Sequence, residues 1–366
     1  MTQRIDFQTD PSQYRHWRVD YDGEVAHVFM DVDENGGLFE GYQLKLNSYD
    51  LGVDIELSDI VQRMRFEHPE VKVAVLRSGK DNVFCAGANI RMLGGAAHSH
   101  KVNFCKFTNE TRNTFEAAEA DSGQKWIAAV KGACAGGGYE LALACNYIML
   151  TDDSTSSVAL PEVPLLAVLP GTGGLTRVTD KRKVRRDRAD VFCSIEEGVK
   201  GRKAVDWRLV DEAVPNSKFD AVVAERARQF AAASTKPVGQ GIALTPLDRT
   251  FAEDGSVSYS TVEVAMDRKA RTVTITLNGP DGAAPADMGR CRPRAPGPGS
   301  CVRRANWTTR SCTCASTRWR RACGCSAPRA IPNRSWRTRR CCWTMPITGW
   351  RARSCNSGNA CSSAST

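Results

Sequence analysis

Three consecutive glycines at residues 136–138 precede a carboxylate, Glu140, near the middle of the chain. The run 126–130 before them has the composition of a buried strand, and the apolar run 141–149 after them has that of a helix. Glycines let another group approach the backbone, and a helix that begins there directs its unpaired N–H groups and positive dipole end at that group. The pattern predicts a site for negative charge on an oxygen, with Glu140 beside it. A turn without chemistry is the alternative.

Strands and helices alternate along the first 240 residues. Two β-rich runs flank Asp22 and Gly23 and predict a hairpin over 17–32. The pattern further predicts helices at 51–66, 101–120, 180–191 and 218–233, strands at 71–77 and 157–160, a strand-to-helix crossing at 83–93, and turns at 161–163 and 170–174. This alternation indicates an α/β fold with mostly parallel strand pairing.

The composition changes abruptly at residue 289. The last 78 residues contain no Leu, Phe, Tyr, Lys, Asp, Glu, Gln or His, and they hold 16 Arg, 10 of the 15 Cys and 5 of the 8 Trp. Of the 50 basic residues of the chain, 34 precede this tail, as do all 41 acidic residues. Residues 1–288 therefore have a net charge of −7. The overall charge of +9 therefore belongs to the tail and indicates nothing about partners of the rest.

The tail has too little aliphatic surface to offset the entropy of its chain. Its Arg and Trp are compatible with nucleic-acid binding, its Cys with a disulfide scaffold, and its Cys-x-Cys pairs with zinc, although no His is present. A GC-rich coding sequence translated out of frame gives the same composition. We interpret residues 289–366 as a frame-shifted, disordered tail, and we expect neither a metal site nor a nucleic-acid partner.

The N-terminus is polar over its first 13 residues, unlike a signal peptide. No apolar run reaches the roughly 18 residues expected of a membrane span. The five cysteines before the tail lack the spacing of a disulfide framework and are predicted to be reduced thiols. We therefore expect a cytoplasmic protein without a membrane partner.

Three motifs, in order, resemble those of the enoyl-CoA hydratase/isomerase (crotonase) superfamily. They are Phe84-Cys85-Ala86-Gly87-Ala88-Asn89-Ile90, the run 132–145, and Leu160-Pro161-Glu162 with Pro170-Gly171-Thr172-Gly173-Gly174. One departure is Asn89, where the superfamily usually has Asp. The resemblance covers residues 15 to about 240. It implies a spiral of repeated ββα units that binds acyl-CoA thioesters, so we expect a crotonase-like acyl-CoA domain at 15–250.

The resemblance also implies roles for individual residues. The N–H groups of Ala88 and Gly137 would stabilise a thioester enolate, and Glu140 and Glu162 occupy the two acid/base positions. Cys105 is a further catalytic candidate, with an ordinary buried thiol as the alternative. The implied substrate-binding residues are Ala86, Ala88, Asn89, Ile90, Arg91 and Gly137. For Glu140 the alternative is a carboxylate at a helix start, and for Glu162 a surface turn residue.

Six residues around the first hairpin recur at a constant offset later in the chain. Tyr14, Val19, Asp22, Val28, Met30 and Val32 recur as Tyr259, Val264, Asp267, Val273, Ile275 and Leu277. This repeat predicts that a second crotonase-like domain begins at residues 256–288 and is truncated where the tail starts. Coincidence between two hairpins is the alternative.

The segments 14–33 and 102–110 and a predicted loop at 91–100 resemble one branch of the superfamily, whose members are longer and carry two crotonase-like halves. This resemblance implies a carbon–carbon lyase of aerobic benzoate degradation. Such an enzyme opens 2,3-epoxy-2,3-dihydrobenzoyl-CoA with two waters and releases formate and 3,4-didehydroadipyl-CoA semialdehyde. It implies an acyl-CoA substrate, a homo-oligomer and no metal or redox cofactor. The alternatives are an enoyl-CoA hydratase/isomerase of fatty or aromatic acyl-CoA, and a non-catalytic binding protein of the same fold.

Overall fold

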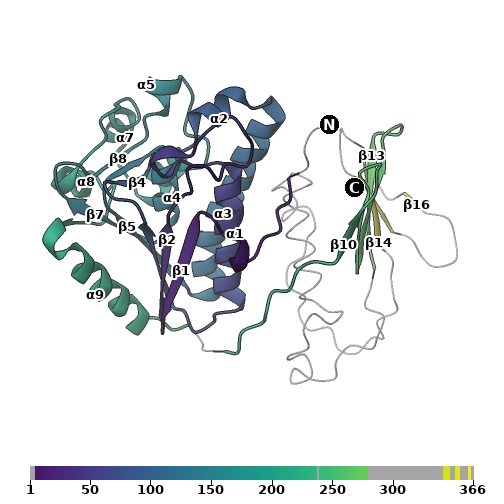
Figure 1. The fold of residues 1–366 in the computed structure, drawn as a ribbon, viewed down its shortest axis with the longest axis horizontal. Helices are drawn as coiled ribbons and strands as arrows, with labels where there is room; N and C mark the ends of the chain where they lie inside the picture. Colours follow the sequence, from purple (N-terminus) through teal and green to yellow (C-terminus); the bar gives the residue numbers. More distant parts are fainter. Residues whose placement is uncertain (1–4, 237–238, 279–340, 347–350, 355–361, 364–366) are drawn as a thin grey trace. The chain divides into compact units, whose positions relative to one another are not determined.

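The computed structural model describes residues 5–236, 239–278, 341–346, 351–354 and 362–363. The chain forms two compact units, Met1–Ile242 and Ala243–Thr366. Figure 1 shows the first unit as a layered α/β body and the second as a set of neighbouring strands. The predicted domain boundaries at 250 and 256 lie close to this division, and the candidate site residues all fall in the first unit.

A six-stranded sheet forms the main layer of the first unit. Its strand order is β1-β2-β3-β5-β7-β9, with β1 and β2 antiparallel and the other neighbours parallel. The strands are β1 (Trp17–Asp22), β2 (Val25–Met30), β3 (Val73–Ser78), β5 (Lys125–Val130), β7 (Tyr147–Asp152) and β9 (Glu212–Pro215). The predicted hairpin over 17–32 is confirmed, because Asp22 pairs with Val25 at its tip.

A smaller parallel sheet has the order β4-β6-β8, from strands β4 (Val83–Cys85), β6 (Ala133–Ala135) and β8 (Ser157–Ala159). From β3 to α5, each turn of the chain gives one strand to the large sheet, the next strand to the small sheet, and then a helix. The ββα repeat implied by the resemblance is therefore present three times. The small sheet brings the ends of β4, β6 and β8 together, and the candidate residues follow these ends.

The helices of the first unit are α1 (Leu51–Phe66), α2 (Ile90–Gly95), α3 (His98–Ser122), α4 (Gly137–Ala144), α5 (Glu162–Leu166), α6 (Gly174–Thr176), α7 (Arg186–Phe192), α8 (Gly201–Asp206) and α9 (Phe219–Ala232). α1 begins where the Asp50 carboxylate accepts the Val53 N–H (3.0 Å), a side-chain N-cap. α3 ends at Gly123, whose φ of 63° is the left-handed conformation typical of a helix end.

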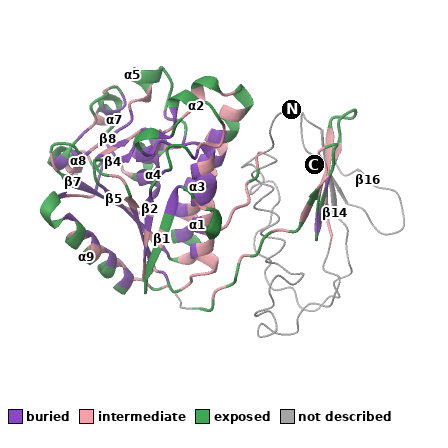
Figure 2. Cartoon of the chain, in the orientation of Figure 1, coloured by how far each residue is buried: buried purple, intermediate pink, exposed green. Residues whose placement is uncertain are grey.

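The large sheet has an apolar core on one face, where α9 covers it. Val73, Ile127 and Met149 of the strands pack against Val223 and Ala227 of the helix, all at most 1% exposed. Figure 2 shows the buried face of α9 turned toward the sheet. Burying this apolar surface provides the main stabilisation of a fold of this kind. The site is attached to this layer because α4 and strand β6 lie between β5 and β7 of the same sheet along the chain.

Several sequence-based predictions of elements were wrong in detail. The predicted turn at 161–163 begins the short helix α5, and the segment 91–100 lies largely in α2 and the first turn of α3. The predicted helix over 180–191 is two elements: a π-helical turn over Arg177–Lys181 and then α7. Lys183 between them has a φ of 54°, which no helix continues through.

The second unit begins with two antiparallel hairpins, from β10 (Arg249–Phe251), β11 (Val257–Tyr259), β12 (Val262–Asp267) and β13 (Thr272–Leu277). Strand β12 lies at the position of β1 plus the offset of the sequence repeat. In the first hairpin Val19 pairs with Val28, whereas Val264 pairs with Ile275, because the second turn is longer. That these strands begin a second crotonase-like domain stays a prediction.

The disorder predicted for the tail stays a prediction, and only a small part of the tail lies within the described residues. It forms β14 (Cys341–Pro346), β15 (Arg351–Ser354) and β16 (Ser362–Ser363), which extend the sheet from β13. A β-prone run such as Trp343 and Thr344 is suited to pair with an open strand edge, which offers unpaired N–H and C=O groups. The remainder of 289–366 lies outside the described residues, and the frame-shift hypothesis concerns the coding sequence.

Candidate active site

Two backbone turns, one after β4 and one after β6, come together at the predicted oxyanion site. A methyl group added at Gly137 would lie 3.5 Å from the Ala88 nitrogen, and one added at Gly87 would lie 3.0 Å from the Gly137 nitrogen. Gly87 has a φ of +88° and Gly136 a φ of +52°, so both turns use conformations that favour glycine. The glycines therefore let the two amides approach each other.

Both amides are available to a ligand. Among the residues that the structure describes, no backbone acceptor is paired with the N–H of Ala88 or Gly137. Gly137 is the first residue of α4, so its N–H has no intrahelical partner and lies at the positive end of the helix dipole. The arrangement can stabilise negative charge on a thioester oxygen with two hydrogen bonds.

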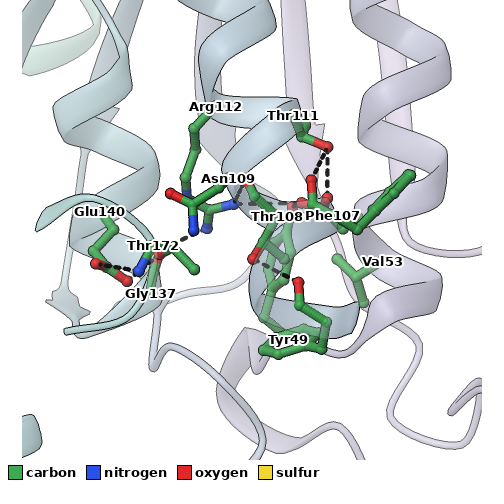
Figure 3. A network of polar contacts seen from close by, with 12 residues as sticks. Tyr49, Val53, Phe107, Thr108, Asn109, Thr111, Arg112, Gly137, Glu140 and Thr172 are labelled. Atoms are coloured by element: carbon green, nitrogen blue, oxygen red, sulfur yellow. Dashed lines mark hydrogen bonds and ion pairs between the residues drawn. The ribbon is translucent and has the colours of Figure 1, made fainter. Parts of the chain in front are cut away.

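Glu140 lies in the first turn of α4 and is 2% exposed. Its Oε1 accepts the N–H groups of Thr172 (2.9 Å) and Gly174 (2.8 Å), and its Oε2 accepts the Thr172 hydroxyl. Figure 3 shows Thr172 turned toward this carboxylate. Three donors occupy three of the four acceptor positions of the Glu140 carboxyl group and leave one open to a water molecule.

Glu162 begins α5, and its environment differs from that of Glu140. Burial raises the pKa of Glu162 to about 7, and the nearby Glu140 carboxylate adds to this. Its buried Oε2 has no hydrogen-bond partner among the described residues, and a methyl group added at Gly136 would lie 3.1 Å from its Oε1. Two carboxyl groups with such different surroundings have the arrangement that an acid/base pair requires, and their catalytic roles stay a prediction.

The helix that carries Glu162 is short and contributes no buried residue. None of the five residues of α5 is buried, and Ala167 closes it with a φ of 53°. The apolar residues that follow Glu162 are exposed; they are Val163, Leu165, Leu166, Val168 and Leu169. By contrast, every residue of α4 after Gly137 is buried, and the Tyr139 hydroxyl donates to the Leu209 carbonyl at 2.7 Å.

Cys105 lies on α3 and faces the loop that holds Glu140. Its Sγ would lie 3.4 Å from a methyl group added at Gly171. Asn109, one turn along, donates to the carbonyls of Cys105 (2.8 Å) and Gly171 (2.9 Å). Burial and the Glu140 charge raise the pKa of the Cys105 thiol, so it is protonated at neutral pH. The thiol is placed near the site as a neutral group, and its catalytic role stays a prediction.

The predicted CoA-binding residues divide into exposed and buried ones. Ala86, Ile90 and Arg91 are exposed at the entrance to α2. Asn89 is 7% exposed and is the N-cap of α2, since its Oδ1 accepts the Met92 N–H (2.9 Å). Its Nδ2 donates to the Gln43 carbonyl (2.7 Å) and the Ser48 hydroxyl (3.0 Å). The Asn89 side chain is thus committed to the turn, which leaves its neighbours to meet a ligand.

Sequence reasoning missed the groups that hold the site in place. The 170–174 loop was singled out, but not as the source of the donors to Glu140. Arg112 of α3, which is 1% exposed, donates from Nη2 to the Gly137 carbonyl at 3.0 Å. A charged residue among the buried positions of α3 was the available signal.

Within the described residues, no group of three or more His, Cys, Asp or Glu side chains is placed to hold a metal ion. The same part of the chain contains no helix that is both long enough and apolar enough to cross a membrane.

The sequence and the fold are both similar to those of known proteins. Residues 43–266 match the sequence model of the enoyl-CoA hydratase/isomerase family. The chain belongs to this family. A crystal structure of an enoyl-CoA hydratase from Geobacillus kaustophilus is 30% identical and superposes with a TM-score of 0.52, covering 60% of this chain and 75% of that one. An enoyl-CoA hydratase from Bacillus anthracis gives 0.51 at 26% identity, over 59% of this chain and 77% of the other. The predicted crotonase-like fold is confirmed.

Among curated proteins, this enoyl-CoA hydratase/isomerase family member is similar to two kinds of relative. It is 58% identical over 277 residues to a benzoyl-CoA-dihydrodiol lyase from Aromatoleum evansii, covering 75% of this chain and 50% of that protein. It is 34% identical over 187 residues to a fatty acid oxidation complex subunit alpha from Idiomarina loihiensis, covering 51% of this chain and 25% of that subunit. The chain thus spans half or less of the length of these relatives.

Proposed function

We propose that this family member is a ring-opening lyase acting on 2,3-epoxy-2,3-dihydrobenzoyl-CoA. Two waters are added, and formate and 3,4-didehydroadipyl-CoA semialdehyde are released. The observation that carries the choice of substrate is the 58% identity to a benzoyl-CoA-dihydrodiol lyase over three quarters of the chain.

The geometry of the site supports this chemistry. The thioester carbonyl would accept the N–H groups of Ala88 and Gly137, so the enolate can serve as an electron sink. Glu140, which accepts three hydrogen bonds, activates water, and Glu162, with its pKa of about 7, protonates the oxygen of the opening ring. Both steps use water, acid and base, so the proposal includes no redox cofactor.

The second candidate is an enoyl-CoA hydratase of fatty or aromatic acyl-CoA. It is favoured by the solved hydratases, which share the fold at 30% and 26% identity. The two functions use the same carboxyl pair. They differ in the acyl group, so product analysis separates them.

The test follows formate release from the epoxide thioester, with crotonyl-CoA hydration measured in parallel. Glu140→Gln and Glu162→Gln should each lower formate release by at least about 10²-fold, the usual effect of removing a positioned acid or base. The matched control is Glu225→Gln, an exposed carboxylate of α9, which should leave turnover unchanged. Rapid hydration of crotonyl-CoA without formate would assign the chain to the hydratases, and formate release that survives both substitutions would remove the pair from the mechanism.

A further inference from the structure

A buried carboxylate, Asp54 of α1, lies behind the two oxyanion amides and has three partners. Its Oδ1 accepts the Tyr49 hydroxyl (2.6 Å) and lies 3.4 Å from Arg112 Nη1, and its Oδ2 accepts the Thr111 hydroxyl (2.5 Å). Asp54 is 0% exposed, Tyr49 1% and Arg112 1%. No element of the proposed reaction uses these groups directly.

One arm of this network reaches the Gly137 turn. Arg112 donates from Nη2 to the Gly137 carbonyl (3.0 Å) and from Nη1 to the Thr108 carbonyl (3.0 Å) of its own helix. Figure 3 shows Arg112 extending from α3 between Gly137 and Tyr49. The guanidinium therefore fixes the peptide plane next to the Gly137 N–H. Its positive charge also lies on the side of the network that faces that turn.

The other arm reaches the Ala88 turn through the backbone of Tyr49. The Tyr49 N–H donates to the Gly87 carbonyl (2.8 Å), and the Tyr49 carbonyl accepts the Asn89 N–H (2.8 Å). These two bonds bracket Ala88, whose own N–H stays free of backbone acceptors within the described part of the chain. Each oxyanion turn is thus bonded to a residue that is itself bonded to Asp54.

The cost of this arrangement indicates that it does more than stabilise the fold. Removing two charges from water is expensive, and replacing a buried ion pair by apolar side chains of similar size is often neutral or stabilising. Positioning offers a reason to keep it, because a displacement of about 1 Å in a catalytic group can cost about 10²-fold in rate.

We propose that Asp54 and Arg112 are positioning residues that set the spacing and direction of the Ala88 and Gly137 N–H groups. The pair also orients a dipole whose positive end faces the forming enolate, where a fixed dipole needs no reorganisation during the reaction. This inference rests on the proposed function, since it concerns the oxyanion site of the same reaction.

The first experiment reads the polarisation of a bound carbonyl. Benzoyl-CoA with a ¹³C thioester carbon is bound to the wild-type chain, and infrared difference spectra give its carbonyl frequency. The wild-type chain should lower this frequency relative to the free thioester. Arg112→Met should lose most of the shift and lower kcat about 10²-fold, with KM nearly unchanged. Arg112→Lys should recover only part of it, because one ammonium group does not reproduce the fork of a guanidinium.

The matched control is Arg63→Met. Arg63 lies on the same helix as Asp54 and pairs with Asp59 (2.7 Å) and Glu67 (3.1 Å), away from both turns. It removes a partly buried ion pair of similar chemistry, and the carbonyl shift should stay at the wild-type value. Loss of the shift in Arg63→Met would mean that any weakened ion pair disturbs the site, which would overturn the inference.

A double variant keeps the proposal testable if Arg112→Met alone does not fold. Asp54→Leu with Arg112→Met leaves no unpaired buried charge and restores an apolar interior. The folded double variant should still lack the carbonyl shift. A folded variant with the wild-type shift would overturn the inference and leave the proposed function intact, whereas a wild-type chain that shows no shift would overturn both.

Discussion

Glu162 is a carboxyl group of the site whose pKa lies near neutral pH. Its pKa of about 7, raised by burial and by Glu140, makes it a proton donor only on the acidic side. We expect kcat to fall as pH rises through about 7, because the acid is then deprotonated. A pH profile of formate release checks this, and in Glu162→Gln the residual activity should no longer show that limb. A wild-type profile flat from pH 6 to about 8 would contradict the assignment.

The same pKa has a consequence for stability. A carboxyl of pKa about 7 in the fold and about 4.3 in the unfolded chain holds its proton more tightly when folded. Its contribution is complete below about pH 4.3 and is lost as pH rises through about 7. Thermal unfolding should therefore show that Glu162→Gln loses this pH dependence, and that its stability relative to wild type improves from pH 5 to about 8. A constant difference in Tm would refute it.

Thr172 gives a third prediction at this scale, through its two hydrogen bonds to Glu140. Thr172→Val keeps the shape and the backbone N–H but removes the hydroxyl donor. A hydrogen bond to a charged group contributes about 1.5–3 kcal/mol, so kcat should fall roughly 10-fold to 10²-fold with KM little changed. Thr155→Val, an exposed hydroxyl bonded only within its own turn to Asp153, is the control. Unchanged kcat in Thr172→Val would show that the amides suffice.

The candidate residues were predictable to different degrees. Glu140 and Glu162 lie beside local motifs, so a reading of the sequence could find them. Asp54 and Arg112 meet across 58 positions, and only the packing of α1 against α3 brings them together. The sequence around a single charged residue in a helix does not indicate which distant residue it contacts, so this pair could not be predicted.

At the scale of elements, the site depends on how closely β4 approaches α4. A methyl group at Gly138 would lie 2.5 Å from the Cys85 carbonyl oxygen, so Gly138→Ala must push the two elements apart. We expect a loss of about 1–3 kcal/mol in the free energy of unfolding, the usual effect of overpacking, and a fall in kcat. Chemical denaturation and turnover measure the two effects.

Gly94→Ala is the matched control for this change. Gly94 lies in α2 with no atom within 4 Å of an added methyl group, so alanine should stabilise the chain by up to about 1 kcal/mol. If Gly138→Ala were as stable as this control, the close approach of β4 and α4 would not be real.

Element boundaries were predictable where one side of the element is buried in a regular pattern. The bounds predicted for α1 agree with the structure, because its apolar positions recur at helical spacing. The segment 180–191 failed for the opposite reason, since its many charged residues carry no periodic burial and Lys183 interrupts it at positive φ. α5 was missed because a five-residue helix without buried residues has no pattern to detect.

At the scale of the whole molecule, the two units have separate cores of very different size. Ile127 belongs to the core under α9, whereas Ile275 packs with Tyr259 and Val262 in the second unit. Ile127→Ala should lower the free energy of unfolding of the first unit by about 2–5 kcal/mol. Ile275→Ala should leave that transition in place. Amide hydrogen exchange measured by mass spectrometry can follow the unfolding of each unit separately. Equal effects of the two substitutions on the first unit would contradict separate cores.

The overall organisation could be predicted from order and repetition rather than from single residues. Three motifs at family-like separations indicated the spiral, and the repeat around Val19 and Val264 indicated a second hairpin, which the structure forms at β12 and β13. The longer second turn escaped prediction, because the constant offset carries over the register of the first hairpin and places Val264 opposite Val273, whereas Val264 pairs with Ile275.

The two carboxyl groups of the site belong to helices that are buried to very different extents. Glu140 belongs to a helix buried along almost its whole length, and Glu162 begins a helix that buries nothing. We therefore expect Glu162 to adjust its position to the substrate by small movements of α5, while Glu140 stays fixed on α4. Substrate tolerance should accordingly be one-sided: thioesters altered where the proton is delivered should still turn over, and those altered where water attacks should not.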